Sequence, residues 1–145
     1  MNGVDLNMNA TVRLNSDLAL QLVGGYSYLS AIDVTSAEDK FYKDQIIYTP
    51  EHSGSGSVVF DNPWLNVGYS FVFSGKRYSS SQNIKMYRLD GYSDHTLSVN
   101  RQFLIKSTSL FLQADLRNLF DENYSVIDAY PMPRRSFTVS AKLNF

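Results

Sequence analysis

Apolar and polar residues alternate along several stretches of this chain. In residues 4–14 the even-numbered positions are all apolar and the odd-numbered positions are all polar. Successive side chains of a strand point to opposite faces of its sheet, so this run predicts one long strand with an apolar face and a polar face. It is about twice as long as an average strand of a soluble protein, which has about 5–6 residues.

The same alternation continues to the end of the chain. From Phe137 to Phe145 every second residue is apolar and the intervening residues are polar. This band is close to the ~9–11 residues that a tilted strand needs to cross a bilayer. Further strands are predicted at residues 18–28, 54–60, 65–73, 92–103 and 110–117. The pattern therefore predicts about seven long strands.

The connections between these strands alternate in length. Short turns are predicted at residues 15–17, 61–63 and 104–108, and long loops at residues 33–50, 76–88 and 119–134. Barrels of outer membranes have short periplasmic turns and long extracellular loops. We therefore expect an all-β, antiparallel up-and-down meander that forms part of a transmembrane barrel, with Phe145 at the periplasmic end. Within the first long loop, residues 37–47 are expected to form a short helix.

The composition narrows the classes of function. The chain has 10 tyrosines, and tyrosine suits a membrane interface because its ring is apolar and its hydroxyl is polar. No run approaches ~18 apolar residues, so no transmembrane helix is expected. The net charge of −1 argues against nucleic-acid binding. No secretory signal precedes the first strand, and because an exported protein needs one, we expect that Met1 is not the natural start.

The segment between the last two strands carries the most specific motif. It reads NLFDENYSVIDAYPMPRR over residues 118–135, and its prolines predict a loop. NLFDENY, YPMP, the arginine after them and the final alternating strand resemble the C-terminus of TonB-dependent outer-membrane receptors. The matching positions are Asn118, Leu119, Phe120, Asp121, Tyr124, Tyr130, Pro131, Pro133, Arg135 and Phe145. Arg134 stands where that family usually has glycine, so we expect either a differently built turn or an additional basic residue at the barrel rim.

The resemblance implies that the chain is part of a larger receptor. Receptors of this family have a barrel of about 22 strands around an N-terminal plug, so residues 1–145 would form roughly the last third of the barrel, without the plug and the earlier strands. The implied partners are outer-membrane lipid, the remainder of the receptor, TonB through an upstream segment, and the barrel-assembly machinery through the last strand. The implied location is the outer membrane of a Gram-negative bacterium. The implied cargo is a scarce nutrient, with siderophore-bound iron and cobalamin both open.

No set of residues predicts catalysis, and we expect no enzyme activity, cofactor or metal site. His52 and His95 each have a serine nearby, but nothing resembles a nucleophile elbow. We interpret both histidines as structural residues near the barrel rim. The first long loop is rich in acidic residues, and we favour a solvated loop over a metal contact.

Basic residues are predicted near the extracellular rim. Lys76, Arg77 and Arg134, with Arg135 beside them, are candidates for contact with an anionic ligand or a lipid phosphate. Ordinary rim charge is the simpler interpretation of this group.

Two other classes of protein stay open on the sequence. A small self-contained outer-membrane barrel would act as an adhesin or a lipid-modifying enzyme, but it would need an eighth strand and an export signal. A soluble lipocalin-like binding protein would turn its apolar faces inward and fold without detergent. In the favoured interpretation the isolated chain has two unpaired sheet edges and is expected to aggregate.

Overall fold

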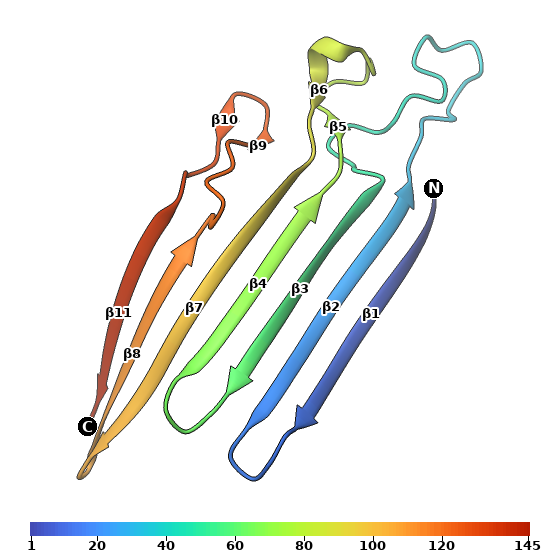
Figure 1. Ribbon diagram of the computed structural model, residues 1–145. Helices are drawn as coiled ribbons and strands as arrows, with labels where there is room; N and C mark the ends of the chain where they lie inside the picture. Colours follow the sequence, from blue (N-terminus) through green and yellow to red (C-terminus); the bar gives the residue numbers. More distant parts are fainter.

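The computed structural model describes all 145 residues. Seven long strands form one antiparallel sheet, and each lies beside the next long strand along the chain (Figure 1). Their bounds are β1 (Asn2–Arg13), β2 (Ala19–Ser30), β3 (His52–Asp61), β4 (Asn66–Ser74), β7 (Tyr92–Ile105), β8 (Thr108–Arg117) and β11 (Ser136–Asn144). The predicted all-β, up-and-down meander is therefore confirmed.

The long loops contain short elements that the sequence pattern did not indicate. β5 (Arg77–Tyr78) pairs with β6 (Arg88–Leu89), and the 3-10 helix η1 (Lys85–Tyr87) lies between them in the chain. β9 (Ser125–Ile127) pairs with β10 (Tyr130–Pro131). None of the helical structure is long and apolar enough to cross a membrane.

The helix expected at residues 37–47 is wrong, because this segment forms turns instead. Asp33 donates its backbone N–H to the carbonyl of Asp44 at 2.9 Å, and Lys43 donates its own to the carbonyl of Asp33 at 2.7 Å. Lys43 also has φ 70°, which lies in the left-handed region and interrupts a right-handed helix. The loop therefore closes on itself.

The two ends of the sheet differ in their connections. The turns of residues 14–18, 62–65 and 106–107 lie at one end, here called the turn end, where the C-terminus also lies (Figure 1). The loops of residues 31–51, 75–91 and 118–135 lie at the other end, here called the loop end. The predicted alternation of short and long connections is confirmed. The last turn is tighter than expected, because β7 extends to Ile105 and Lys106 adopts φ 56°.

The register separates the alternating residues into two faces. One row across five strands consists of Met8, Gly24, Gly56, Phe71 and His95. Rows of this parity are mostly apolar and make up what we call the apolar face. The opposite parity, which includes the paired residues Ser98 and Asp115, makes up the polar face.

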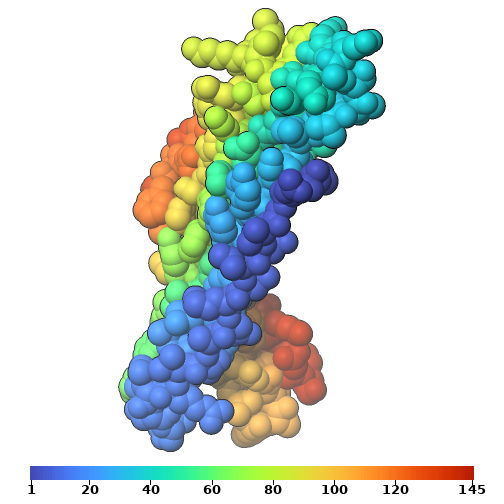
Figure 2. All heavy atoms as spheres, turned by 90° about the vertical axis from the view of Figure 1, so that its right-hand side faces the viewer, coloured from blue at the N-terminus to red at the C-terminus, as the bar shows by residue number.

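The sheet is a single layer without an enclosed core. Only Ala31, Arg77, Asp115 and Asn118 are buried. Seen from its N-terminal edge, the molecule is narrow and elongated, with the first two long loops gathered at one end (Figure 2). β1 and β11 each have one neighbour, so both edges of the sheet are unpaired. An apolar face of this extent needs an apolar medium or a partner to cover it.

Candidate functional site

The motif segment between β8 and β11 is organised by Asn118. This residue is 3% exposed and has φ 48°, a left-handed conformation that asparagine tolerates better than most residues. Its Nδ2 donates to the carbonyls of Glu122 at 2.9 Å and Pro133 at 3.1 Å, and its Oδ1 accepts the backbone N–H of Glu122 at 2.8 Å. One side chain thus joins the NLFDENY and YPMP parts of the motif.

Asp121 joins the beginning of the same loop to its end. Its carboxylate accepts two hydrogen bonds from the guanidinium of Arg134, at 3.0 and 2.7 Å, and one from the backbone N–H of Arg135 at 2.9 Å. These bonds hold the pKa of Asp121 well below its usual range, and the bond from Arg134 contributes most. Arg134 has no positive φ, so this position needs no glycine, and its basic side chain is exposed at the loop end.

Tyr124 and Glu122 attach the loop to β7. The Tyr124 hydroxyl donates to Oδ2 of Asp94 at 2.5 Å, and its ring stacks on Tyr92 with centroids 4.2 Å apart. Burial, followed by the neighbouring carboxylate of Asp94, raises the pKa of the Tyr124 hydroxyl above its ordinary value. Oε2 of Glu122 accepts the backbone N–H and the hydroxyl of Ser93, at 3.1 and 3.2 Å.

Arg77 lies inside this assembly and not at its surface. It is 3% exposed, and its guanidinium donates to the carbonyls of Ser125 at 2.5 Å and Val126 at 2.9 Å. The guanidinium also lies 5.2 Å from the ring centroid of Tyr92. Arg77 therefore links the second long loop to the third, which does not fit its predicted contact with an external ligand. Its neighbour Lys76 is exposed, so a ligand contact there stays a prediction.

The other motif residues do not gather in one cluster. Leu119 donates its backbone N–H to the carbonyl of His95 at 2.8 Å. The Phe120 ring meets the ring of His95 edge-on, with centroids 4.7 Å apart. Tyr130 and Pro131 lie in β10, where Tyr130 is 70% exposed. Phe145 is 95% exposed at the turn end, far from the rest of the motif (Figure 1).

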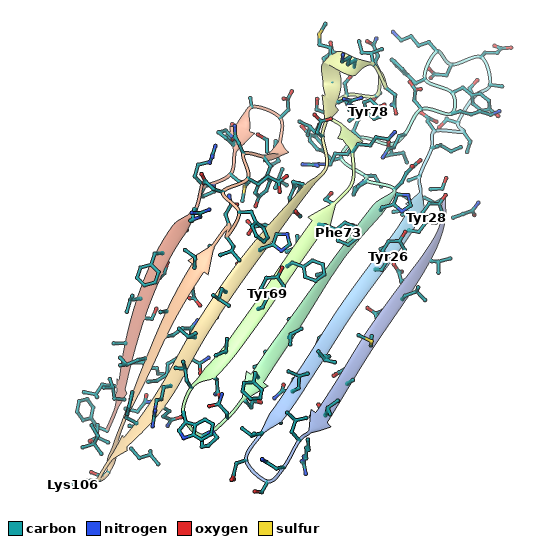
Figure 3. The ribbon with its side chains drawn as sticks, in the orientation of Figure 1. Tyr26, Tyr28, Tyr69, Phe73, Tyr78 and Lys106 are labelled. Atoms are coloured by element: carbon teal, nitrogen blue, oxygen red, sulfur yellow. The ribbon has the colours of Figure 1, made fainter.

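Both histidines share hydrogen bonds with tyrosines on the apolar face. The Tyr26 hydroxyl lies 2.7 Å from Nδ1 of His52, and the Tyr69 hydroxyl lies 2.6 Å from Nδ1 of His95. Figure 3 shows Tyr26 near the loop end of β2 and Tyr69 closer to the middle of β4. Amphipathic rings on the apolar face are typical of the interfacial girdle of a membrane barrel.

A cavity of about 280 Å³ opens on the polar face below the third long loop. Its lining includes Tyr92, Asp94, Thr96, Arg117 and Tyr124. The sequence pattern does not single out Tyr92 or Asp94, although strand parity places Asp94 on the polar face. Their contact with Tyr124 depends on the fold of the loop, which no local pattern reveals. Phe71, Val72, Val126 and Met132 also line the cavity, so it offers apolar surface together with hydrogen bonds and charge. No three acidic or imidazole groups converge there to hold a metal ion.

Comparisons with known proteins point to one family. A family model described as "TonB dependent receptor-like, beta-barrel" matches residues 1–119. No curated protein matches the chain. Among solved structures, the chain is similar to BauA, the ferric preacinetobactin receptor from Acinetobacter baumannii, with a TM-score of 0.78 and 12% sequence identity. The similarity covers 96% of this chain and 21% of that chain, so this chain spans about a fifth of the other protein's length.

Proposed function

The chain belongs to the TonB-dependent receptor-like β-barrel family, and on this premise we propose that residues 1–145 form the C-terminal part of the barrel of an outer-membrane receptor that imports a scarce nutrient. The observation that carries the proposal is the strict separation of three short turns and three long loops to opposite ends of an open sheet. The long loops would face the cell exterior and the turns the periplasm, as in other outer-membrane barrels.

The two faces and the two edges support the same arrangement. The apolar face would contact outer-membrane lipid, and the polar face would line the interior of the barrel around a plug supplied by the rest of the receptor. The free edge of β1 would pair with a preceding strand and that of β11 with the first strand of the barrel, which removes both edges. The alternatives of a small self-contained barrel and a lipocalin-like protein each need a closed sheet, which these seven strands do not form.

Chelated iron is the nutrient class to test first. The similar solved structure is described as a ferric preacinetobactin receptor, and cobalamin is the second class. In this proposal the plug and the long loops capture the ligand, and TonB acts through an upstream segment of the receptor. Residues 1–145 supply wall, loops and the strand β11 that the barrel-assembly machinery recognises, and they carry out no catalysis.

Two experiments test this function. An antibody raised against residues 119–134 should detect, in the outer-membrane fraction of native cells, a band several times larger than 145 residues would give. Deleting the gene should then abolish uptake of a ferric siderophore, and the full-length gene should restore it. Loss of cobalamin uptake instead would select the second nutrient class. A small band, or unchanged uptake of both nutrients, would contradict the proposal.

A further inference from the structure

The apolar face has a hollow where two neighbouring strands carry glycine in the same row. Gly24 of β2 lies opposite Gly56 of β3 on one side and Met8 of β1 on the other. Around them runs an open groove of about 470 Å³. Its apolar lining includes Leu6, Met8, Leu22, Val58 and Phe71. The groove is therefore a recess in the face that the proposed function turns toward lipid.

The glycines of this region differ in how they are covered. A Cβ atom on Gly56 would lie 2.7 Å from the ring of Phe71, so that ring already occupies the space above Gly56. Phe73 covers Gly54 in the same way, at 2.6 Å. At Gly24 the nearest atoms would be Cε of Met8 and the carbonyl oxygen of Ser55, both at 3.9 Å. The floor of the groove at Gly24 is thus left open by the protein's own side chains.

On the apolar face, polar side chains occur at only one end of the groove. Asn7, Ser55 and Ser57 also line it, but strand parity directs their side chains to the polar face. Tyr26 lines the groove on the side of the loop end, where its hydroxyl meets Nδ1 of His52 at 2.7 Å. The ring of Tyr28 lies beyond, 5.2 Å from that of His52 (Figure 3 shows both tyrosines). Toward the middle of the sheet the lining becomes aliphatic, with Leu22 and Val58. This order of polar and apolar groups matches a lipid that has its head at the interface and its chain directed toward the bilayer centre.

We propose that this groove binds one acyl chain of an outer-leaflet lipid A molecule, with the polar head of the lipid beside Tyr26 and His52. The inference rests on the proposed function, because the loop end must face the cell exterior for the polar end of the groove to lie in the outer leaflet. A bound chain supplies the contacts that an empty recess would lack. The lipid would therefore be retained more strongly than the surrounding bilayer lipid.

The test uses the full-length receptor purified from outer membranes in mild detergent, with lipid A retention counted by native mass spectrometry. Gly24→Leu places a side chain in the groove, and we expect it to lose the most strongly retained lipid A molecule. Two controls should retain lipid as the wild type does. Gly68→Leu has similar free space, with nothing nearer than 3.8 Å to its Cβ, but it lies on the polar face. Ala114→Leu adds the same side chain to the apolar face away from the groove.

Equal lipid A retention by wild type and Gly24→Leu would overturn the inference, and so would retention of a phospholipid in place of lipid A. If Gly24→Leu does not assemble, Gly24→Ala replaces it, because a single methyl group fits the 3.9 Å clearance. A partial loss of retention is then expected, and no loss counts against the groove. Nutrient uptake is measured in the same strains. Normal uptake with unchanged lipid retention refutes only the lipid site, whereas a wild-type receptor missing from the outer membrane refutes the proposed function as well.

Discussion

Asn118 offers the sharpest test of how the third long loop is held. Replacing it with glycine removes the side chain that bonds to Glu122 and Pro133. Glycine adopts the observed φ of 48° without strain, so this substitution isolates the hydrogen bonds. Alanine removes the same bonds and adds the cost of a left-handed conformation, about 1–2 kcal/mol. Asn118→Ala should therefore destabilise the third long loop more than Asn118→Gly does.

The free energy lost in Asn118→Gly follows from the three hydrogen bonds that the substitution removes. Each intramolecular hydrogen bond contributes about 0.5–1.5 kcal/mol net, and leaving a buried partner unsatisfied costs more, so the loss from Asn118→Gly is about 3 kcal/mol. Because about 1.4 kcal/mol corresponds to a factor of ten, the opening equilibrium of the loop should shift roughly a hundredfold. The effect is confined to the loop, since the strand ladders do not involve the Asn118 side chain.

Hydrogen exchange of the full-length receptor measures this opening. The backbone N–H of Met132, which bonds to the carbonyl of Tyr124 at 2.9 Å, should exchange about a hundredfold faster in Asn118→Gly. Asn123→Gly is the matched control, because Asn123 is exposed in the same loop. Exchange of Met132 at the wild-type rate in Asn118→Gly would refute the role of Asn118. Equal acceleration by the control would show that glycine alone loosens the loop.

Three further predictions concern the loop end and the C-terminus. Because the pKa of Asp121 is depressed, its pairing with Arg134 stabilises the loop fully at pH values above the ordinary carboxylate pKa, and this stabilisation is lost as pH falls through the lowered pKa. In Arg134→Ala, acid-induced proteolysis of the loop should therefore begin at a higher pH than in wild type. Arg77→Ala should expose residues 118–135 to protease, whereas Lys76→Ala should leave proteolysis unchanged and weaken only the binding of an anionic ligand. Faster proteolysis in Lys76→Ala but not in Arg77→Ala would contradict the burial of Arg77. Deleting Phe145, which is 95% exposed, should lower the amount of receptor in the outer membrane through lost recognition by the assembly machinery, and unchanged levels on an immunoblot would count against this.

The strands were predictable because one physical constraint sets their pattern. A sheet with an apolar and a polar face requires a period of two, and residues 4–14 or 137–145 satisfy it over their whole length. The loops follow no such constraint. Arg77 is read from the sequence as a rim cation, yet it is buried because carbonyls distant in sequence surround it. The helix expected at residues 37–47 was wrong because backbone bonds between Asp33 and its loop partners override weak local periodicity.

The groove illustrates a second limit of sequence reasoning. Gly24 and Gly56 are visible in the sequence, and their parity places both on the apolar face. Whether a glycine leaves a recess depends on the rings beside it, and only the register shows that Phe71 covers Gly56 while Gly24 stays open. The motif around Asn118 is similar in this respect, because its residues could be identified from the resemblance but their hydrogen bonds could not.

Labelling of introduced cysteines in intact cells tests the central claim most directly. The chain has no cysteine of its own, so Ser81→Cys in the second long loop and Ser16→Cys in the first turn each provide one exposed thiol in this segment. A bulky, membrane-impermeant maleimide applied to cells that express the full-length receptor should label Ser81→Cys at once and Ser16→Cys only after the outer membrane is opened. Labelling of Ser16→Cys but not Ser81→Cys in intact cells, or of neither before lysis, would contradict a receptor barrel whose long loops face the cell exterior.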